Sequence, residues 1–548
     1  MPFRPLLIPV IIVVLAFIVF RPWPDRAGSA AMQASAERGA TIFQERCQVC
    51  HQAAGLGVAN VFPPLAGADF LVKERKRSIM ALCEGLTGKI TVNGVEFDGQ
   101  MPAQALDDRQ VADVMNFVGV SWGNKLRPFT ALEVAAVRCE SKSFPTFAKL
   151  TASMQFAPLP APPSGYELRE VARLPEDEFG SRMAAHGGRV WVLTQKGSVF
   201  LLDPKTGAME RVLAVSEYAD RSSGVQTMGI TVGPDERMWI TSNQELKRKG
   251  ELTTNEVVIW RTPPVGADGR PGKLEAWFRT TYPHGGGFNH GVSNIAFGPD
   301  GMLYLSSGSR TDGGEQPANH SPAGEHELTA SIWRMDPAAA QPKIEILVRG
   351  LRNPYGFAWD AAGNMFSVTN GPDVNSAEEM DHIVAGKHYG FPYQFSDWPL
   401  LPKPYPHTPD APSGLTFTTP VRNLGPDGGA GLATFDAHSC PTGTIWCGDD
   451  FPEPLRNAFL VTRYGNLLPE SKTALVDSGF DVLAVKVARA VDGSWAARTI
   501  TVLAPLGRPI DVVRTAPGTA LILEYTRPTN MRDGLGWLPG RVIELRKK

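Results

Sequence analysis

A short turn-and-strand unit recurs through residues 166–548. Each copy is a turn containing glycine or aspartate, followed by a short strand of alternating aromatic and aliphatic residues. The copies lie at residues 186–193, 233–240, 298–305 and 360–367, with a weaker one at 516–523. Such repetition in a β-rich chain is typical of a β-propeller, and this stretch has room for about six four-stranded blades. The alternative, an irregular β-sandwich, does not explain the repeat.

The motif Cys-Gln-Val-Cys-His at residues 47–51 predicts a covalently attached c-type haem. Cys47 and Cys50 stand three residues apart, so on a helix both thiols reach the vinyl groups of one haem. His51 then lies beneath the iron as its first axial ligand. The alternative is a redox or zinc-binding cysteine pair. It is disfavoured because no second pair follows at zinc-site spacing and the histidine is immediate.

Three methionines are candidates for the second axial ligand of the iron. Met80 and Met115 fall in predicted helices, where a methionine usually packs into the core. Met101 falls in a predicted loop, and Pro102 stiffens the backbone there. Because a loop can aim a side chain at the iron, Met101 is the predicted ligand.

Residues 36–123 resemble a class I cytochrome c. They carry the haem motif on a first helix, a Pro-Pro-Leu loop at residues 63–65, a Met-Pro loop and a closing helix. The resemblance implies ligation of the iron by His51 and Met101, which raises the reduction potential and suits an electron relay. We expect this all-α domain to occupy residues 34–140.

The N-terminus indicates export. The apolar run at residues 6–20 is short for a spanning helix and long enough for the core of a signal peptide within residues 1–30. Arg21 and Trp23 are typical of a membrane interface, so a retained anchor formed by residues 5–21 stays an open alternative. Either form predicts a periplasmic protein, with the inner membrane as the place of any anchor.

The four cysteines outside the haem motif suit such an oxidising compartment. Cys440 and Cys447 flank a Pro-Thr-Gly sequence that predicts a turn, so we expect them to pair. The same compartment predicts a disulfide between Cys83 and Cys139.

The remaining sequence separates the two domains and excludes one class of partner. Residues 141–165 lose periodicity and end in a proline-rich stretch, which predicts a stiff, extended linker. The net charge of -2 argues against a nucleic-acid-binding surface, which would show an excess of lysine and arginine.

Three unusual loops lie beside the repeated strands of the predicted propeller. The first, residues 286–291, contains His290 between glycines. A lone histidine is more often structural than catalytic, but these glycines allow a ligand to approach closely. The second loop is at residues 350–359. The third begins at residues 370–373 and continues through Glu378 and Glu379 to a Gly-Lys-His-Tyr-Gly-Phe-Pro stretch.

In this order the loops resemble those of the soluble quinoprotein sugar dehydrogenases, which include aldose, glucose and sorbosone dehydrogenases. That family is a six-bladed propeller that binds pyrroloquinoline quinone (PQQ) and calcium. The resemblance covers most of residues 166–548 and is best over 289–392. It implies that His290 is the general base on the substrate hydroxyl. The other roles that it implies are contacts to the quinone by Arg352 and Asn353, calcium binding by the carbonyls of Gly371 and Pro372, and pairing of Arg463 with a cofactor carboxylate.

The chain departs from that family at three points. Asn289 stands where the glucose enzymes have an acidic residue before the catalytic histidine. They also have Gly-Asp where this chain has Gly308-Ser309. Because that aspartate orients the base, we expect Asp312 or Glu315 to substitute for it. The family's early glutamine has no clear counterpart here, so the choice of substrate does not carry over.

The two resemblances together imply a quinohaemoprotein dehydrogenase. A sugar or alcohol would lose its hydroxyl proton to His290, while calcium and Arg352 stabilise negative charge on the quinone. The electrons would leave one at a time through the haem to a downstream cytochrome or oxidase. Three alternatives stay open. They are a haem d1 nitrite reductase with eight blades, a calcium lactonase, which has no use for a fused haem, and a non-catalytic binding propeller in which the haem is a passive relay.

Overall fold

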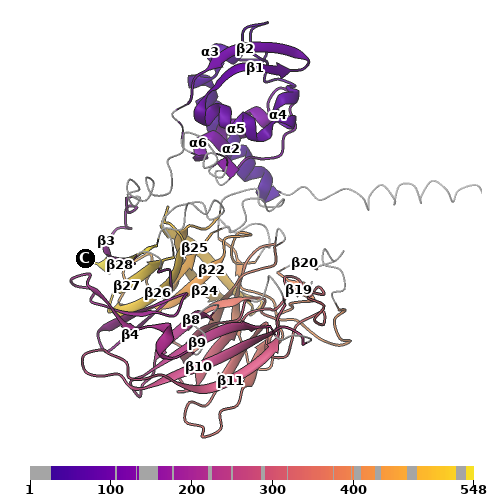
Figure 1. Cartoon of the computed structure of the whole chain (residues 1–548). Coiled ribbons are helices and arrows are strands. Elements are labelled where there is room, and N and C mark those ends of the chain that lie inside the picture. Colours follow the sequence, from indigo (N-terminus) through magenta and orange to yellow (C-terminus); the bar gives the residue numbers. More distant parts are fainter. Residues whose placement is uncertain are drawn as a thin grey trace, which may run out of the picture. The chain divides into compact units, whose positions relative to one another are not determined.

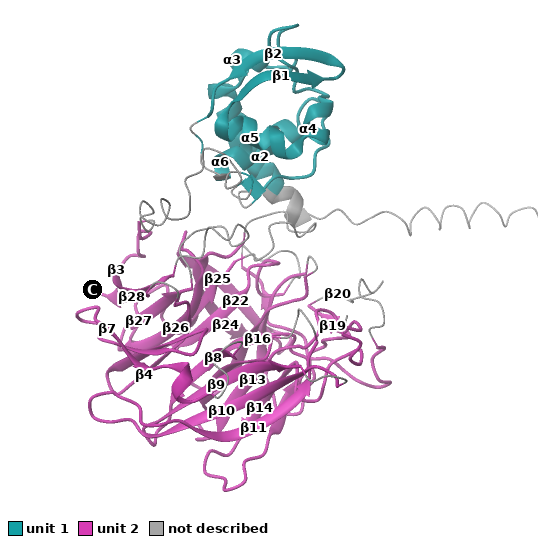
Figure 2. Ribbon diagram, in the orientation of Figure 1, with its two compact units in different colours: residues 1–141 teal, residues 142–548 magenta. Residues whose placement is uncertain are grey.

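The computed structural model forms two compact units, Met1–Ser141 and Lys142–Lys548 (Figure 1, Figure 2). The expected export segment at residues 5–21 lies outside the described residues, and so does Cys139. Among the helices that the structure describes, none has both the length and the apolar character needed to cross a membrane. The described residues are 26–104, 106, 108–130, 133–134, 137, 158–175, 178–219, 225–247, 251–285, 290–317, 319–373, 376–396, 398–399, 409–425, 433–465, 478–525 and 539–548.

The first unit is mainly helical, as predicted. Its longest helices, α2 and α6, cross closely at Gly39, where a Cβ would lie 1.9 Å from the carbonyl oxygen of Asp113. Arg38 also reaches Asp113, at 2.7 Å. Glycine and this ion pair therefore fix the crossing. The helices are α2 (Arg26–Arg46), α3 (Gln48–His51), α4 (Asp69–Lys73), α5 (Arg75–Glu84) and α6 (Asp108–Val120).

A two-stranded hairpin, β1 (Leu86–Val92) and β2 (Val95–Met101), accompanies these helices. Its turn is Asn93-Gly94, with φ angles of 52° and 79°, as tight hairpin turns require. Met101 is the last residue of β2 and pairs with Leu86, so its predicted place in a loop is wrong. The Asn-Gly pair between two valines is the signal of this hairpin, and the sequence analysis missed it.

The second unit contains six blade sheets among its described strands, which confirms the predicted six-bladed propeller. A short hairpin, β19 (Gln394–Phe395) with β20 (Trp398–Pro399), lies outside the blades. The first three blades are β4 (Gly180–His186), β5 (Arg189–Thr194), β6 (Val199–Leu202) and β7 (Met209–Leu213); β8 (Val225–Val232), β9 (Arg237–Leu246), β10 (Thr254–Pro264) and β11 (Glu275–Pro283); and β12 (Val292–Phe297), β13 (Leu303–Ser307), β14 (Ser331–Met335) and β15 (Glu345–Arg349). The last three are β16 (Pro354–Trp359), β17 (Met365–Thr369) and β18 (Glu379–Ile383); β22 (Pro441–Cys447), β23 (Ala458–Arg463), β24 (Asp481–Arg489) and β25 (Trp495–Leu503) with β21 (Arg422–Asn423); and β26 (Pro509–Ala516), β27 (Thr519–Glu524) and β28 (Arg541–Lys547) with β3 (Tyr166–Arg173).

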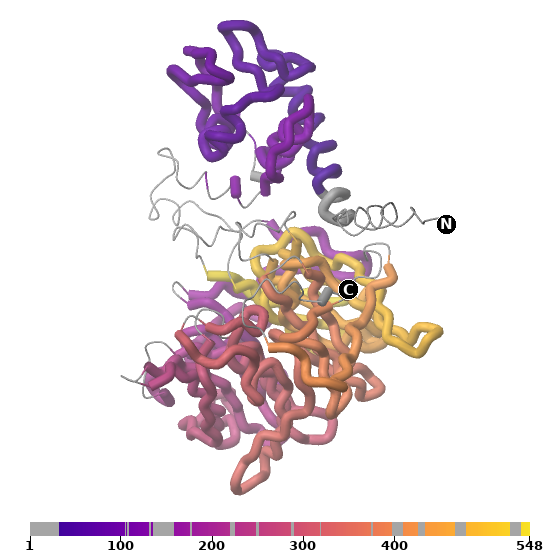
Figure 3. Tube along the Cα trace, turned by 90° about the vertical axis from the view of Figure 1, so that its right-hand side faces the viewer, coloured from indigo at the N-terminus to yellow at the C-terminus, as the bar shows by residue number. Residues whose placement is uncertain are grey.

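The ring of blades is closed by strands from the two ends of the unit. The first strand, β3, pairs in antiparallel fashion with β28 and completes the sixth blade. Arg169 and Glu544 join the two strands by an ion pair of 2.8 Å. In Figure 3 the segment after residue 158 is purple and the strand that it pairs with is yellow.

Each predicted turn-and-strand copy is the hairpin between the first and second strands of a blade. Gly301, Gly363 and Gly518 hold these turns with φ between 67° and 83°, a region that glycine adopts without strain. Glu236 takes the same left-handed conformation in the β8–β9 turn. The β22–β23 connection is longer and lacks the repeat, which is why no copy was found there.

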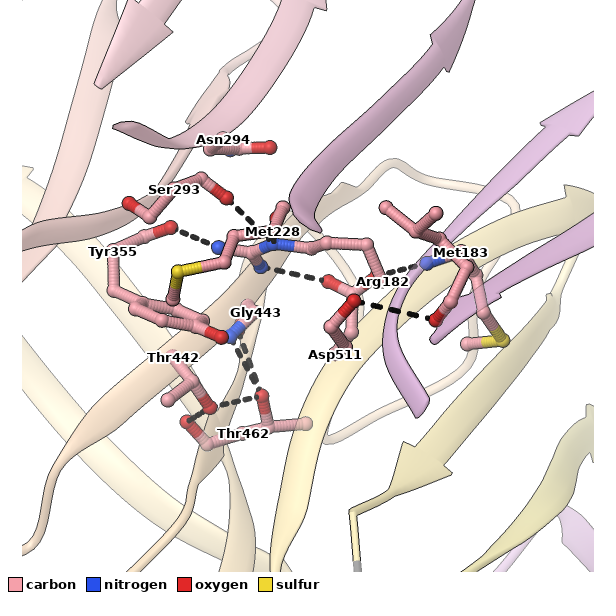
Figure 4. A network of polar contacts seen from close by, with 12 residues as sticks. Arg182, Met183, Met228, Ser293, Asn294, Tyr355, Thr442, Gly443, Thr462 and Asp511 are labelled. Atoms are coloured by element: carbon pink, nitrogen blue, oxygen red, sulfur yellow. Dashed lines mark hydrogen bonds and ion pairs between the residues drawn. The ribbon is translucent and has the colours of Figure 1, made fainter. Parts of the chain in front are cut away.

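Arg182 of β4 ties the innermost strands of the blades together (Figure 4). Its guanidinium donates to the backbone carbonyls of Met228, at 3.1 Å, Ser293, at 3.2 Å, and Tyr355. It also pairs with Asp511 at 3.1 Å, and both side chains are buried. One side chain therefore links strands β4, β8, β12, β16 and β26.

The remaining inner strand, β22, joins the ring through glycine contacts. A Cβ on Gly356 of β16 would lie 2.0 Å from the carbonyl oxygen of Thr442, and one on Gly443 would lie 2.6 Å from the Cα of Asp511. The backbones of β16, β22 and β26 meet there without side chains between them. All six blades are thus joined at the centre of the ring.

The strand β22 also decides the predicted pairing of Cys440 with Cys447. Both cysteines are free, because Pro441–Cys447 is an extended strand that separates them and not a turn that brings them together. That prediction is wrong. The predicted partner of Cys83, Cys139, lies outside the described residues.

Removal of the central cation should destabilise the propeller. Arg182→Met leaves Asp511 buried without its partner, which costs about 3–5 kcal/mol of the free energy of unfolding. Urea unfolding followed by tryptophan fluorescence measures this loss. The matched control is Arg546→Met, which breaks an exposed ion pair with Glu167 and should cost less than about 1 kcal/mol. Equal losses in the two variants would contradict the central role of Arg182.

Candidate functional site

An apolar pocket lies in the first unit and holds about 680 Å³ of empty space, its open mouth included. Its lining includes Cys47, His51 and Met101, three of the four predicted haem residues. Cys47 is the N-cap of α3, and Cys50 lies on the same single turn, half-buried. The haem motif therefore stands on one wall of a pocket of ligand size.

His51 is held in one orientation by the backbone. Its Nδ1–H donates to the carbonyl oxygen of Pro63 at 3.0 Å, so its Nε2 carries the lone pair that an iron ion needs. Burial lowers the pKa of His51, although the bond to Pro63 opposes this shift. The ring is therefore neutral, as a metal-binding histidine must be. Cysteines, neutral imidazole and apolar walls together fit a covalent haem.

The three candidate methionines differ in position. Met101 and Met115 both line the cavity, whereas Met80 packs against the core of the unit and is not part of the lining. Met101 is half-buried at the end of β2, while Met115 is fully buried in α6. Met101 stays the predicted second ligand, now with Met115 as its nearest alternative.

Met101→Ala should lower the reduction potential of the haem, because it removes the thioether ligand. The weak sulfur-to-iron absorption band at the red end of the spectrum should disappear. Potentiometric titration and absorption spectra of the oxidised protein measure both effects, with Met80→Ala as the control that leaves them unchanged. A persistent band in Met101→Ala would transfer the role to Met115.

In the second unit, His290 immediately precedes β12. Residues 286–289 of its predicted loop, including Asn289, lie outside the described residues. The Nδ1–H of His290 donates to the carbonyl oxygen of Ser309 at 3.1 Å, which leaves Nε2 unprotonated. Burial lowers the pKa of His290 to about 3, and the positive charge of Arg352 contributes to the shift. The ring is thus a neutral base at neutral pH.

Arg352 is a buried cation held by a carboxylate. Its Nη2 donates to Oδ1 of Asp312 at 2.5 Å and its Nε to the carbonyl oxygen of Asp312 at 3.0 Å. Its Nη1 lies 3.4 Å from the carbonyl oxygen of Asn370. The charge of Arg352 acts on the pKa of His290, so the two predicted catalytic residues lie close together.

Neither Asp312 nor Glu315 orients His290, contrary to the expectation from sequence. Oδ1 of Asp312 accepts from Arg352 and from the backbone N–H of Asp373 at 3.0 Å. Glu315 accepts from the backbone N–H groups of Asp312, at 3.0 Å, and Gly313, at 2.7 Å. The ring of His290 is held by Ser309 instead.

Several polar atoms near Arg352 have no hydrogen-bond partner in the described part of the chain. They are Oδ1 of Asn353, Oδ1 of Asn370 and Nε2 of His438. Asn353 and His438 are 6% and 8% exposed, so these atoms are deprived of bulk water as well. Gly308 brings the site together, because a Cβ there would lie 2.5 Å from that of His290 and 2.8 Å from Oδ1 of Asn353. The cation of Arg352 suits negative charge on a ligand, and the two amide oxygens, which accept hydrogen bonds, suit donor groups on the same polar ligand.

The predicted calcium loop is held by a buried carboxylate. The N–H of Gly371 donates to Oε2 of Glu378 at 2.6 Å, and burial raises the pKa of Glu378 to about 7. A Cβ on Gly371 would lie 2.6 Å from the ring of Phe395, so the loop is tightly packed. The described residues contain no cluster of three or more histidine, cysteine or acidic side chains that could hold a metal. A calcium ion here would therefore depend on the carbonyls of Gly371 and Pro372 and on its ligand.

The predicted cofactor contact Arg463 is already paired. It makes two bonds to Asp481, at 2.8 and 2.6 Å, and one to Asp436 at 3.3 Å. Its charge is thus balanced within the protein, which weakens the predicted role toward a cofactor carboxylate. Both partners are distant in sequence, so this pairing was not visible there.

The sequence analysis missed two residues near the site. Arg508 is buried, and its charge acts together with that of Arg352 on the pKa of the Cys440 thiol. His438 has a left-handed φ of 60°, and its pKa is lowered by burial and then by Arg352. No motif marks either residue. The one signal for Arg508 is its position directly before the sixth blade.

Comparisons with known proteins agree with this division of the chain. The family model of Cytochrome c matches residues 36–122, and that of Glucose / Sorbosone dehydrogenase matches residues 179–398. Cytochrome c-552 of Thermus thermophilus is 40% identical over 112 residues, which are 19% of this chain and 85% of that protein. The cytochrome c subunit of the quinone alcohol dehydrogenase of Gluconacetobacter polyoxogenes is 36% identical over 103 residues, which are 18% of this chain and 22% of that protein.

Solved structures similar to this chain include two aldose sugar dehydrogenases. The PQQ-bound form of the enzyme from Streptomyces coelicolor has a TM-score of 0.47 and 20% identity, and the match covers 70% of this chain and 99% of that one. The soluble apo-form from Escherichia coli has a TM-score of 0.47 and 14% identity, over 70% of this chain and 100% of that one.

Proposed function

Because the chain belongs to the cytochrome c family through residues 36–122 and to the glucose/sorbosone dehydrogenase family through residues 179–398, we propose that it is a quinohaemoprotein dehydrogenase. Its substrate is a sugar or an alcohol, its propeller cofactor is PQQ, and its haem c takes the electrons onward. A cytochrome or an oxidase is the downstream acceptor, and the periplasm is the compartment, with the inner membrane as the place of any anchor. A relative of the haem domain serves a quinone alcohol dehydrogenase, which supports this pairing of domains.

The observation that carries the proposal is the pairing of a neutral base with a buried cation. Nε2 of His290 is unprotonated because Nδ1–H is bonded to Ser309. Arg352 supplies a positive charge next to it, and Asn353 and His438 supply unsatisfied polar atoms. This set suits removal of a hydroxyl proton beside a ligand that becomes negative.

Each side chain of the site has a separate role in the proposed reaction. His290 takes the proton of the substrate hydroxyl at Nε2. Arg352 would hold its positive charge near the quinone, and the amide of Asn353 would hydrogen-bond to the quinone. When bound, PQQ would supply the two-electron acceptor that protein side chains lack. In the first unit, Cys47 and Cys50 would attach the haem, and His51 and Met101 would bind its iron.

The alternatives fit less well. An eight-bladed nitrite reductase conflicts with the six blades among the described strands. A lactonase has no use for the haem domain. The direct test is the purified protein, which should oxidise sugars or alcohols with an artificial acceptor only after PQQ and calcium are added. A failure with a broad panel of aldoses, polyols and alcohols would leave the non-catalytic binding propeller in its place.

Removal of calcium should abolish the activity, and added calcium should restore it. Gly371 and Pro372 offer two carbonyl ligands, so the site is weak without its cofactor. Activity is measured after treatment with a chelator and again after calcium is returned. Full activity in excess chelator, with the cofactor still bound, would show that no metal is needed.

His290→Ala should slow reduction of the haem by substrate about 10²–10⁴-fold, because it removes the general base. The haem spectrum and cofactor binding should be unchanged. The controls are His284→Ala, in the segment before His290, and His320→Ala, in the segment after β13 (Leu303–Ser307), and both should have much milder effects. If His290→Ala reduces the haem at the parent rate, the base is another residue.

A further inference from the structure

Ser309 connects the proposed base, His290, to the buried cation, Arg352, through backbone hydrogen bonds. It is fully buried. Its carbonyl oxygen accepts from both the backbone N–H and the Nδ1–H of His290, at 3.0 and 3.1 Å. Its own N–H donates to the carbonyl oxygen of Arg352 at 2.6 Å. The backbone of this one residue therefore sets the distance between His290 and Arg352.

The hydroxyl of Ser309 also helps to hold the Nδ1–H group of His290. Its proton is donated to the carbonyl oxygen of Thr311 at 2.7 Å. Its Oγ also lies 3.2 Å from Nδ1 of His290 and, with its proton committed, can only accept there. Nδ1–H is thus shared between two acceptors of the same residue. A proton on Nε2 with none on Nδ1 would lose both bonds.

The two atoms of Ser309 that accept from Nδ1–H, the carbonyl oxygen and Oγ, both belong to neutral groups. The charges that act on the His290 ring from the described residues are those of Arg352 and Asp312. The charge of Asp312 favours an imidazolium, but its carboxylate is bonded to Arg352, and among the described residues no carboxylate hydrogen-bonds to the ring. Arg352 repels an imidazolium. The low pKa of His290, about 3, agrees with this geometry.

We propose that Ser309 is the positioning residue of His290, and that its neutral acceptors hold the ring in the single tautomer with Nε2 open and keep it uncharged well into acid solution. This inference rests on the proposed function for its meaning, because it assigns to the dehydrogenase a base that needs no carboxylate. An enzyme built in this way keeps its base unprotonated at a pH where a carboxylate-supported histidine is already charged.

The test is nitrogen NMR of the full-length protein without substrate, with its histidines labelled with ¹⁵N and the His290 signals assigned by their loss in His290→Gln. We expect the Nδ1–H tautomer at every pH from about 5 to 8, with no titration in that range. Ser309→Ala keeps the carbonyl bond and should keep the tautomer. A ring that titrates near the ordinary histidine pKa, or that carries its proton on Nε2, would overturn the proposal.

Ser309→Asp supplies the missing charge and should raise the pKa of the His290 ring by about 1–3 units, as an opposite charge within 4–6 Å does. Ser309→Asn introduces a side chain of the size of aspartate without its charge. As the control, it should not raise the pKa of the His290 ring. In the active protein, the acid limb of the pH–rate profile should move upward in Ser309→Asp by the same shift. A folded Ser309→Asp with an unmoved ring would refute the role of the neutral acceptor. If the tautomer is as expected but no substrate is oxidised, the proposed function fails and the role of Ser309 does not.

Discussion

The propeller depends on a charged contact at its centre. Six sheets arranged in a ring bring the backbones of their inner strands close together, and the buried backbone polar groups there need hydrogen-bond partners. Arg182 supplies them for four neighbouring strands at once, and Asp511 balances its charge. Three carbonyl groups and one carboxylate are satisfied by a single side chain. His290 and Arg352 lie just before the inner strands β12 and β16, so this contact also helps to fix the positions of these two residues.

The two units position a reactive histidine in the same way. His51 donates its Nδ1–H to the carbonyl oxygen of Pro63, and His290 donates its own to that of Ser309. A backbone carbonyl is neutral and cannot rotate away, so it fixes the tautomer and leaves Nε2 available. In the first unit, His51 lines the apolar pocket. In the second unit, His290 lies near Arg352. The same backbone bond thus orients the proposed iron ligand, His51, and the proposed base, His290.

The features that were predicted from sequence are those that repeat or have a fixed spacing. The blade hairpins recur because each needs the same turn, and the haem motif needs two thiols on one turn of a helix. Errors arose where local residues suggested a turn and long-range pairing decided otherwise. The Pro-Thr-Gly after Cys440 is part of β22 because Thr444 and Ile445 pair with β23. Arg463 is neutralised by Asp436 and Asp481, whose positions depend on the completed blade. The orientation of His290 by Ser309 required coordinates, since a backbone acceptor leaves no trace in sequence.

The closure of the ring by β3 and β28 has a consequence for biosynthesis. Arg169 and Glu544, which join these strands, are 375 residues apart in sequence. During synthesis β3 emerges long before its partner, and it presents an unpaired edge until the sixth blade is complete. The haem domain is made first and its Arg38–Asp113 contact spans only 75 residues, so it is able to fold independently of that event. The order of emergence therefore favours a chain whose haem domain is folded while its propeller still requires protection from aggregation.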